Sequence, residues 1–92
     1  MKVSIIKVSR YAYEDKQGAY HEGTVLSVLM PTAETKDNVG YDVKQFRLNY
    51  NLFDEMTKLF KENKPVELVM DYVPMRNGNY YAKAKSINGI EL

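Results

Sequence analysis

The chain has 92 residues, 45% of them hydrophobic and 27% charged, with a formal net charge of +1. This composition excludes a disordered chain, and the length suits one domain, residues 1–92, because two separate cores would need a longer sequence. The sequence has no cysteine and one histidine, which excludes disulfides and thiolate metal sites. We therefore expect neither a metal ion nor a cofactor.

The hydropathy pattern predicts no membrane contact. No apolar run approaches the roughly 20 residues that a membrane-spanning helix needs. The first seven residues, Met1 to Lys7, lack the apolar core of a signal peptide. We therefore expect a cytoplasmic protein with no membrane partner.

The first two predicted strands form a long hairpin. Residues 2–13 are rich in β-branched and aromatic side chains with polar ones between them, which favours a strand. The apolar alternation changes phase directly after Ile5, so we expect a bulge there, or a strand that passes from one side of a barrel to the other. After a polar turn at 14–18, residues 19–30 form the second strand, with Gly23 as its expected bend.

A polar loop separates the second strand from the third. Pro31 ends the second strand, and residues 31–38 are polar. Residues 39–50 return to a strand pattern, with a second phase change between Val43 and Phe46.

An amphipathic helix follows over residues 51–62. Asn51 suits the N-cap, and Asn63 and Pro65 end the helix. One apolar stripe recurs at helical spacing: Leu52, Phe53, Met56, Leu59 and Phe60. Because so short a helix is marginal alone, we expect this stripe to pack on a sheet.

The last two long strands, 66–75 and 79–87, form a second hairpin. Asn77 and Gly78 lie between them, and Asn-Gly is favoured in two-residue type I′ turns. A further turn is expected at 88–89, leading into a short apolar tail.

A two-residue turn would fix the pairing of this hairpin. It would place Tyr72 opposite Lys83 and Met70 opposite Lys85, which mixes apolar and charged side chains on one face. Pro74 cannot donate a ladder hydrogen bond and would relieve this conflict if it shifted the register.

The predicted element order is β–β–β–α–β–β. Twisted antiparallel strands with one helix at the end of the barrel are typical of the five-stranded OB-fold, in which the helix follows the third strand. This all-β barrel with one helix is the fold we expect. An α+β sheet with one packed helix would give the same order of elements.

Three segments carry a resemblance to a known class of proteins: the hairpin residues 10–13 and 18–20, the strand residues 44–47, and the aromatic and basic strand 80–85. In layout and size the chain resembles the small OB-fold single-stranded-DNA-binding proteins of phages and mobile elements. The resemblance implies sequence-tolerant binding of single-stranded DNA. It also implies replication or recombination proteins as further partners. Apart from the resemblance, the open strand edges of so small a barrel and the apolar tail 87–92 predict a homodimer, which would present two grooves.

Binding of this kind needs aromatic faces that stack on bases and cations that neutralise phosphates. Three groups of residues meet this need: Arg10, Tyr11, Tyr13, Lys16 and Tyr20 in the first hairpin; Lys44, Phe46 and Arg47 in the third strand; and Arg76, Tyr80, Tyr81, Lys83 and Lys85 in the last hairpin. A packing role stays open for each group. Tyr11 and Tyr13 would also suit the end of a barrel, Phe46 would suit the core, and the last group would suit a solvated outer face.

The sequence gives little support to catalysis. Glu14 and Asp15 read as a turn pair, His21 has no nucleophile partner in the sequence, and there is no glycine-rich phosphate loop. We therefore expect a protein that is not an enzyme. The alternative to nucleic-acid binding is a protein-interaction module, an adaptor or inhibitor of a phage or mobile element, which the near-zero net charge suits.

Overall fold

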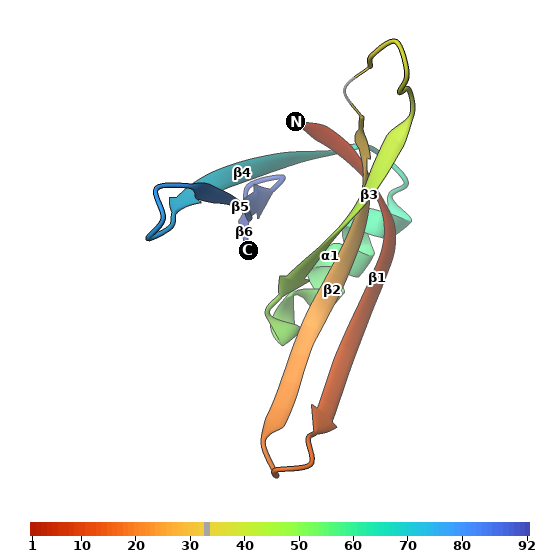
Figure 1. The fold of residues 1–92 in the computed structure, drawn as a ribbon. Coiled ribbons are helices and arrows are strands. Elements are labelled where there is room, and N and C mark those ends of the chain that lie inside the picture. Colours follow the sequence, from red (N-terminus) through yellow and green to blue (C-terminus); the bar gives the residue numbers. More distant parts are fainter. Residues whose placement is uncertain (33) are drawn as a thin grey trace.

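The computed structural model describes residues 1–32 and 34–92, so Ala33 of the predicted polar loop lies outside the described residues. It contains six strands, one short 3-10 helix and one α-helix (Figure 1). The strands are β1 (Lys2–Glu14), β2 (Tyr20–Pro31), β3 (Tyr41–Leu48), β4 (Val66–Pro74), β5 (Tyr80–Ile87) and β6 (Ile90–Glu91), and the helices are η1 (Tyr50–Leu52) and α1 (Phe53–Lys61).

The six strands form one antiparallel sheet in the order β3-β2-β1-β4-β5-β6. The expected mainly β structure with one α-helix is therefore confirmed. The sheet is open: its β1–β2 and β4–β5 hairpins project in different directions (Figure 1). The radius of gyration is 15.3 Å, whereas a compact chain of this length would measure about 12 Å. The difference reflects these two projecting arms.

The sheet formed by β1, β2 and β3 has an inner face and an outer face. Because opposite residues of an antiparallel ladder share a face, the pairing of the strands assigns each side chain to one of them. The inner face carries Leu26 and Val28 of β2, both fully buried. They pack with Met56 of α1 and with Leu68 and Ile87 of the β4–β5 hairpin. The outer face is the one opposite this core.

One of the two expected phase changes is present. The β1–β2 register shifts between Ile5 and Lys7, so the predicted bulge is confirmed and Ile6 is its extra residue. The phase change expected in the third strand is wrong, because β3 pairs with β2 without a shift. Val43 consequently lies on the outer face and is 59% exposed, whereas Phe46 lies on the inner face against the core.

The helix begins later than the sequence predicts. Asn51 is not its N-cap, because it lies inside η1, and α1 follows with Leu52 in the N-cap position and no side-chain capping bond. The apolar stripe does pack on the sheet through Met56, and Asn63 lies beyond the helix end with a φ of 54°. Phe60 is 43% exposed and contributes least to this packing.

The turn of the β4–β5 hairpin also differs from the prediction. Pro74 pairs with Tyr80, so the loop comprises residues 75–79 rather than two residues. Within the arm this places Tyr72 opposite Ala82 and Asp71 opposite Lys83, which removes the expected mixing of charged and apolar residues.

A bulge in β5 at Lys85, opposite Val69 and Met70, then shifts the pairing of the two strands by one residue before they reach the core. Beyond it Leu68 pairs with Ile87, and both are buried. The type I′ conformation occurs instead at Asn88, whose φ is 48°, and Gly89, whose φ is 82°.

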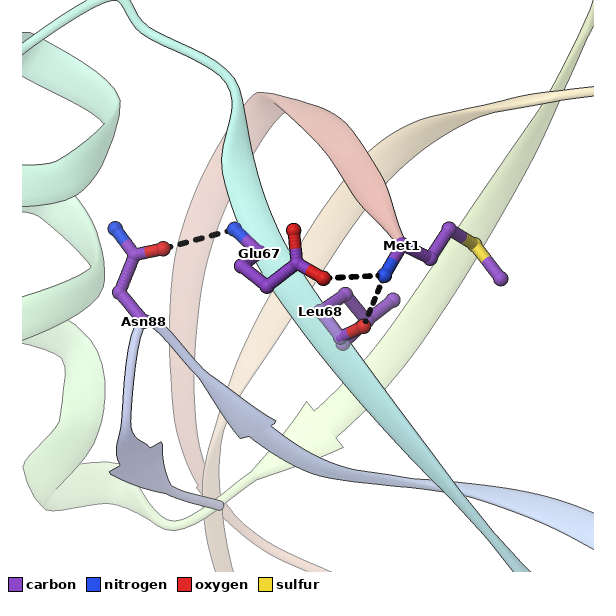
Figure 2. Close-up of polar contacts among 4 residues, drawn as sticks. All are labelled: Met1, Glu67, Leu68 and Asn88. Atoms are coloured by element: carbon purple, nitrogen blue, oxygen red, sulfur yellow. Dashed lines mark hydrogen bonds and ion pairs between the residues drawn. The ribbon is translucent and has the colours of Figure 1, made fainter.

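The β4–β5 hairpin joins β1 through a short contact, with Lys2 opposite Glu67 and Val3 opposite Val66. Figure 2 shows the polar groups that fix this junction. The Met1 amino group donates to Glu67 Oε1 at 2.6 Å and to the Leu68 carbonyl at 3.1 Å, and the Glu67 amide donates to Asn88 Oδ1 at 2.8 Å.

The hydrogen bond from the Met1 amino group, together with its positive charge, holds the pKa of the Glu67 carboxyl below its ordinary value. This ion pair and the hydrogen bonds together tie the start of β4 to the start of β1.

Candidate nucleic-acid interface

The strands β1, β2 and β3 contribute no acidic side chain to their outer face, where the nearest acid is Asp15 of the turn, in contact with His21. These strands, all of whose residues the structure describes, contain the acids Glu14, Glu22 and Asp42, and the register assigns all three to the inner face. The outer face presents the following residues in register: Ser4, Lys7, Ser9, Tyr11 and Tyr13 of β1; His21, Gly23, Val25, Ser27 and Leu29 of β2; and Tyr41, Val43, Gln45 and Arg47 of β3. It therefore combines cations, aromatic rings and neutral polar groups, as a surface for a polyanion requires.

A groove continues this surface across the edge of β3. It has a volume of about 570 Å³ and lies between β3 and β5. Its lining includes Arg47 and Phe46 from one side, Tyr81 and Lys83 from the other, and no acid among the described lining residues. The predicted groups of the third strand and of the last hairpin thus meet in one groove, where Arg47 and Lys83 are 36 positions apart in the sequence.

The part of the outer face at the far end of the β1–β2 hairpin is aromatic. The rings of Tyr11 and Tyr13 have centroids 6.0 Å apart, and the rings of Tyr13 and His21 are stacked with centroids 5.0 Å apart. His21 Nε2 lies 2.8 Å from Asp15 Oδ2, and a carboxylate can only accept, so Nε2 carries a proton. Gly23 is no bend: it pairs with Tyr11 inside a continuous strand, and a Cβ there would lie 2.6 Å from the Tyr11 hydroxyl oxygen.

The Asp15 carboxylate should titrate at an unusually low pH. The hydrogen bond from His21, and those from the Ala19 and Gln17 amides, hold its pKa below its ordinary value. The ordinary value is about 3.9 in an unfolded chain. Because the folded value is lower, the carboxylate stabilises the hairpin tip above about pH 3.9, and this contribution is lost as the pH falls through the folded pKa.

We expect the carboxyl carbon resonance of Asp15, followed by NMR, to titrate with its midpoint below about 3.9. The amide resonances of Gln17 and Ala19 should follow the same curve. The Asp15→Asn variant, which lacks the titrating group, should show no such step in these amides. A midpoint at or above 3.9 would contradict the geometry of the tip.

The two hairpin tips have the same turn. Gly18 donates to the Asp15 carbonyl and the Asp15 amide donates to the Ala19 carbonyl; Gly78, Met75 and Asn79 repeat this pattern. The glycines have φ values of 83° and 85°. This is a type I turn followed by a left-handed residue. Each turn presents one exposed cation at the same position, Lys16 in the first and Arg76 in the second.

Several predicted residues lie away from the outer face. The Arg10 guanidinium lies over the rings of Phe53 and Tyr50, at 4.6 and 5.7 Å from their centroids, so it packs against the helical segment. Lys44 and Phe46 are on the inner face, although Phe46 also reaches the groove at the strand edge.

Three more predicted residues have neighbours outside the outer face of β1–β3. The Tyr20 hydroxyl donates to Glu22 on the inner face of its hairpin. Tyr80 pairs with Pro74 on the same face as Ala82. Lys85 lies at the β5 bulge, in a hollow that it shares with Lys83 and with the acids Asp71 and Glu91.

The sequence predictions missed Lys7, His21 and Gln45. The bulge at Ile6 reverses the alternation of β1, and a count that includes this reversal assigns Lys7 to the face of Tyr11. The Gln45 amide donates to Ser27 Oγ at 3.4 Å and lines the groove. His21 carries no sequence signal of its own, because its role depends on the ring of Tyr13 across the hairpin.

Among the described residues, no helix is both long enough and apolar enough to cross a membrane. The same residues contain no group of three or more side chains that could hold a metal ion. Comparisons of the chain with protein-family models, with curated proteins and with solved structures found no match.

Proposed function

We propose that the protein binds single-stranded nucleic acid with little sequence preference. The observation that carries this proposal is the outer face of β1–β3, to which these strands contribute no acid and which continues into the groove between Arg47 and Lys83. A single nucleic-acid strand bound along this path would stack its bases on aromatic side chains and place its phosphates near cations. Lys16 and Arg76 at the two hairpin tips would add further phosphate contacts. The resemblance favours DNA over RNA and a cytoplasmic role beside replication or recombination proteins.

The strand order supports an OB-fold-like architecture. In the order β3-β2-β1-β4-β5, the strands β3 and β5 would close a five-stranded barrel if they paired with each other. The groove lies between these two strands. We infer that the open sheet is an unclosed form of such a barrel, with its ligand groove at the seam.

The proposal is tested by titrating a fluorescent oligo-dT strand with the protein and following anisotropy over a salt series. We expect micromolar or tighter binding at low salt that weakens steeply as salt rises, because phosphate contacts release counterions. Unlabelled single strands of any sequence should compete better than a duplex of equal length. If the strand shows no binding at low salt and micromolar protein, the proposed function is wrong.

A second candidate is a protein-interaction role, which the β4–β5 arm favours. The arm exposes these large apolar side chains, each at least 43% accessible: Val69, Tyr72, Met75, Tyr80 and Tyr81. Tyr72 and Tyr80 share one face of the arm, and exposed apolar side chains that lie together are typical of protein interfaces. The partner would be a second copy of the chain or another protein.

The apolar tail does not serve as a free dimer surface in this structure, because Ile87 is buried and Ile90 and Leu92 pack against the core. Sedimentation at high concentration tests dimerisation through the arm. A pull-down that recovers a stoichiometric protein, together with no oligonucleotide binding, would favour the interaction module over the nucleic-acid binder.

A further inference from the structure

We propose that Tyr11, Tyr13 and His21 form a preformed stacking platform for unpaired nucleobases, and that Asp15 is its positioning residue. The inference rests on the proposed function and adds a specific ligand chemistry to it: the flat face of a base rather than the phosphate backbone. It also assigns His21 to the binding surface.

The three rings form a continuous series on the outer face of the β1–β2 hairpin. The Tyr13 and His21 rings are nearly parallel, with an angle of 26° between their planes, and Tyr11 is tilted by 40° from Tyr13. Centroid separations of 5.0 and 6.0 Å lie within the range of favourable aromatic pairs. A base that stacks on such a ring contributes about 1–3 kcal/mol to binding.

Asp15 holds the outermost ring in place. Its Oδ1 accepts hydrogen bonds from the Gln17 and Ala19 amides, both at 2.9 Å, so the turn itself fixes the carboxylate. Its Oδ2 then holds His21 Nε2 at 2.8 Å. Because the ring is ordered before any ligand binds, less conformational entropy is lost on binding.

Gly23 supports the other end of the series. A Cβ at this position would lie 2.6 Å from the Tyr11 hydroxyl oxygen and 2.8 Å from its Cζ. The backbone of Gly23 is not in the left-handed region, so its turn-forming capacity does not explain the glycine. The close approach of the Tyr11 ring to the strand explains it, as is usual for a glycine inside a strand.

The platform is open to a ligand. Pairing of β2 with β3 ends at Thr24 and Leu48, so the rings lie on a two-stranded part of the hairpin beyond that end. Tyr13 is 52% exposed and the His21 side chain is 44% exposed. The nearby acid, Asp15, is engaged by hydrogen bonds with His21 and the turn, which limits its repulsion of a polyanion.

The test uses the fact that His21 is the single histidine of the chain, so its imidazole proton resonances are unambiguous. The protein is titrated with an oligo-dT strand and, separately, with an abasic strand of the same length and charge. We expect the His21 resonances to shift upfield with oligo-dT, because a stacked base shields them, and to show no such shift with the abasic strand.

Two variants check the roles of the rings and of the carboxylate. Tyr13→Leu should weaken oligo-dT binding about 5- to 150-fold, the equivalent of one lost stacked base. The matched variant Tyr72→Leu, on the face of the other hairpin that carries Ala82 and not Lys83, should bind as the parent does. Asp15→Asn should reduce the upfield shift of His21 in the bound state while the Met56 methyl resonance in the core stays unchanged.

The outcomes separate this inference from the proposed function. If oligo-dT binds by anisotropy but the His21 resonances do not move, or move equally with the abasic strand, the platform is wrong and the function stands. The same holds if Tyr13→Leu binds as tightly as the parent. If no strand binds at all, both proposals fail.

Discussion

Replacing Arg47 and Lys83 together by glutamine should reduce the salt dependence of oligonucleotide binding. Each phosphate contact to a single strand contributes about 0.7 to the slope of log affinity against log salt concentration, so losing two should reduce the slope by about 1.4. The two side chains line opposite sides of one groove. The measurement is the anisotropy titration at several salt concentrations, and affinity should fall for all sequences alike.

The matched control removes two cations from α1, in the variant Lys58→Gln with Lys61→Gln. Both side chains are exposed and lie outside the outer face and the groove. This variant has the same net charge as the groove variant, so a general loss of attraction would affect both equally. We expect the control to keep most of the parent slope. Equal slopes for the two variants would rule out a defined phosphate path through the groove.

The Met56→Ala variant should lose about 2–5 kcal/mol of unfolding free energy, the range found when a buried methionine is truncated. Met56 is fully buried and belongs to the cluster that joins α1 to the sheet. Alanine favours a helix at least as well as methionine, so the loss reports packing and not helix propensity. Each kcal/mol corresponds to about 4–8 °C in the melting temperature of a domain of this size.

Met75→Ala is the matched control, because the same side chain is there 44% exposed at a hairpin tip. Its unfolding free energy should stay within about 0.5 kcal/mol of the parent. The two variants are compared by thermal and urea unfolding. Equal stabilities would show that α1 does not dock through Met56.

The helix and its packing face were predictable because both depend on local spacing. Met56 recurs with the other apolar residues at a period of 3.6, and only a sheet could cover that stripe. The helix start was not predictable from Asn51, because a good capping residue also tolerates the 3-10 turn that the chain adopts there. The bulge near Ile5 was predictable for a similar reason, since it leaves a visible break in the alternation.

The turn of the β4–β5 hairpin shows why other features of the fold could not be predicted. Gly78 has a positive φ, as Asn-Gly suggested, but the same dipeptide fits both a two-residue turn and the longer turn found here. The choice between them depends on which faces of β4 and β5 are covered, which is a property of the whole fold. For the candidate site, the shared face of Tyr11 and Tyr13 followed from alternation. The packing of Arg10 against Phe53 did not follow from alternation, because it is a contact between segments that are distant in the sequence.

The turn at 75–79 and the bulge beside Lys85 also bear on how this sequence can change in length. Removing one residue from the turn would produce the register that already holds at Leu68 and Ile87, so the bulge would no longer be needed and the core would keep its pairs. The β5 side chains of the arm, however, would exchange faces, and Lys83 would move from the face of Asp71 to the face of Tyr72. A single deletion at a surface loop, ordinarily the most tolerated kind of change, would here spare the fold and invert the side of the groove that β5 supplies.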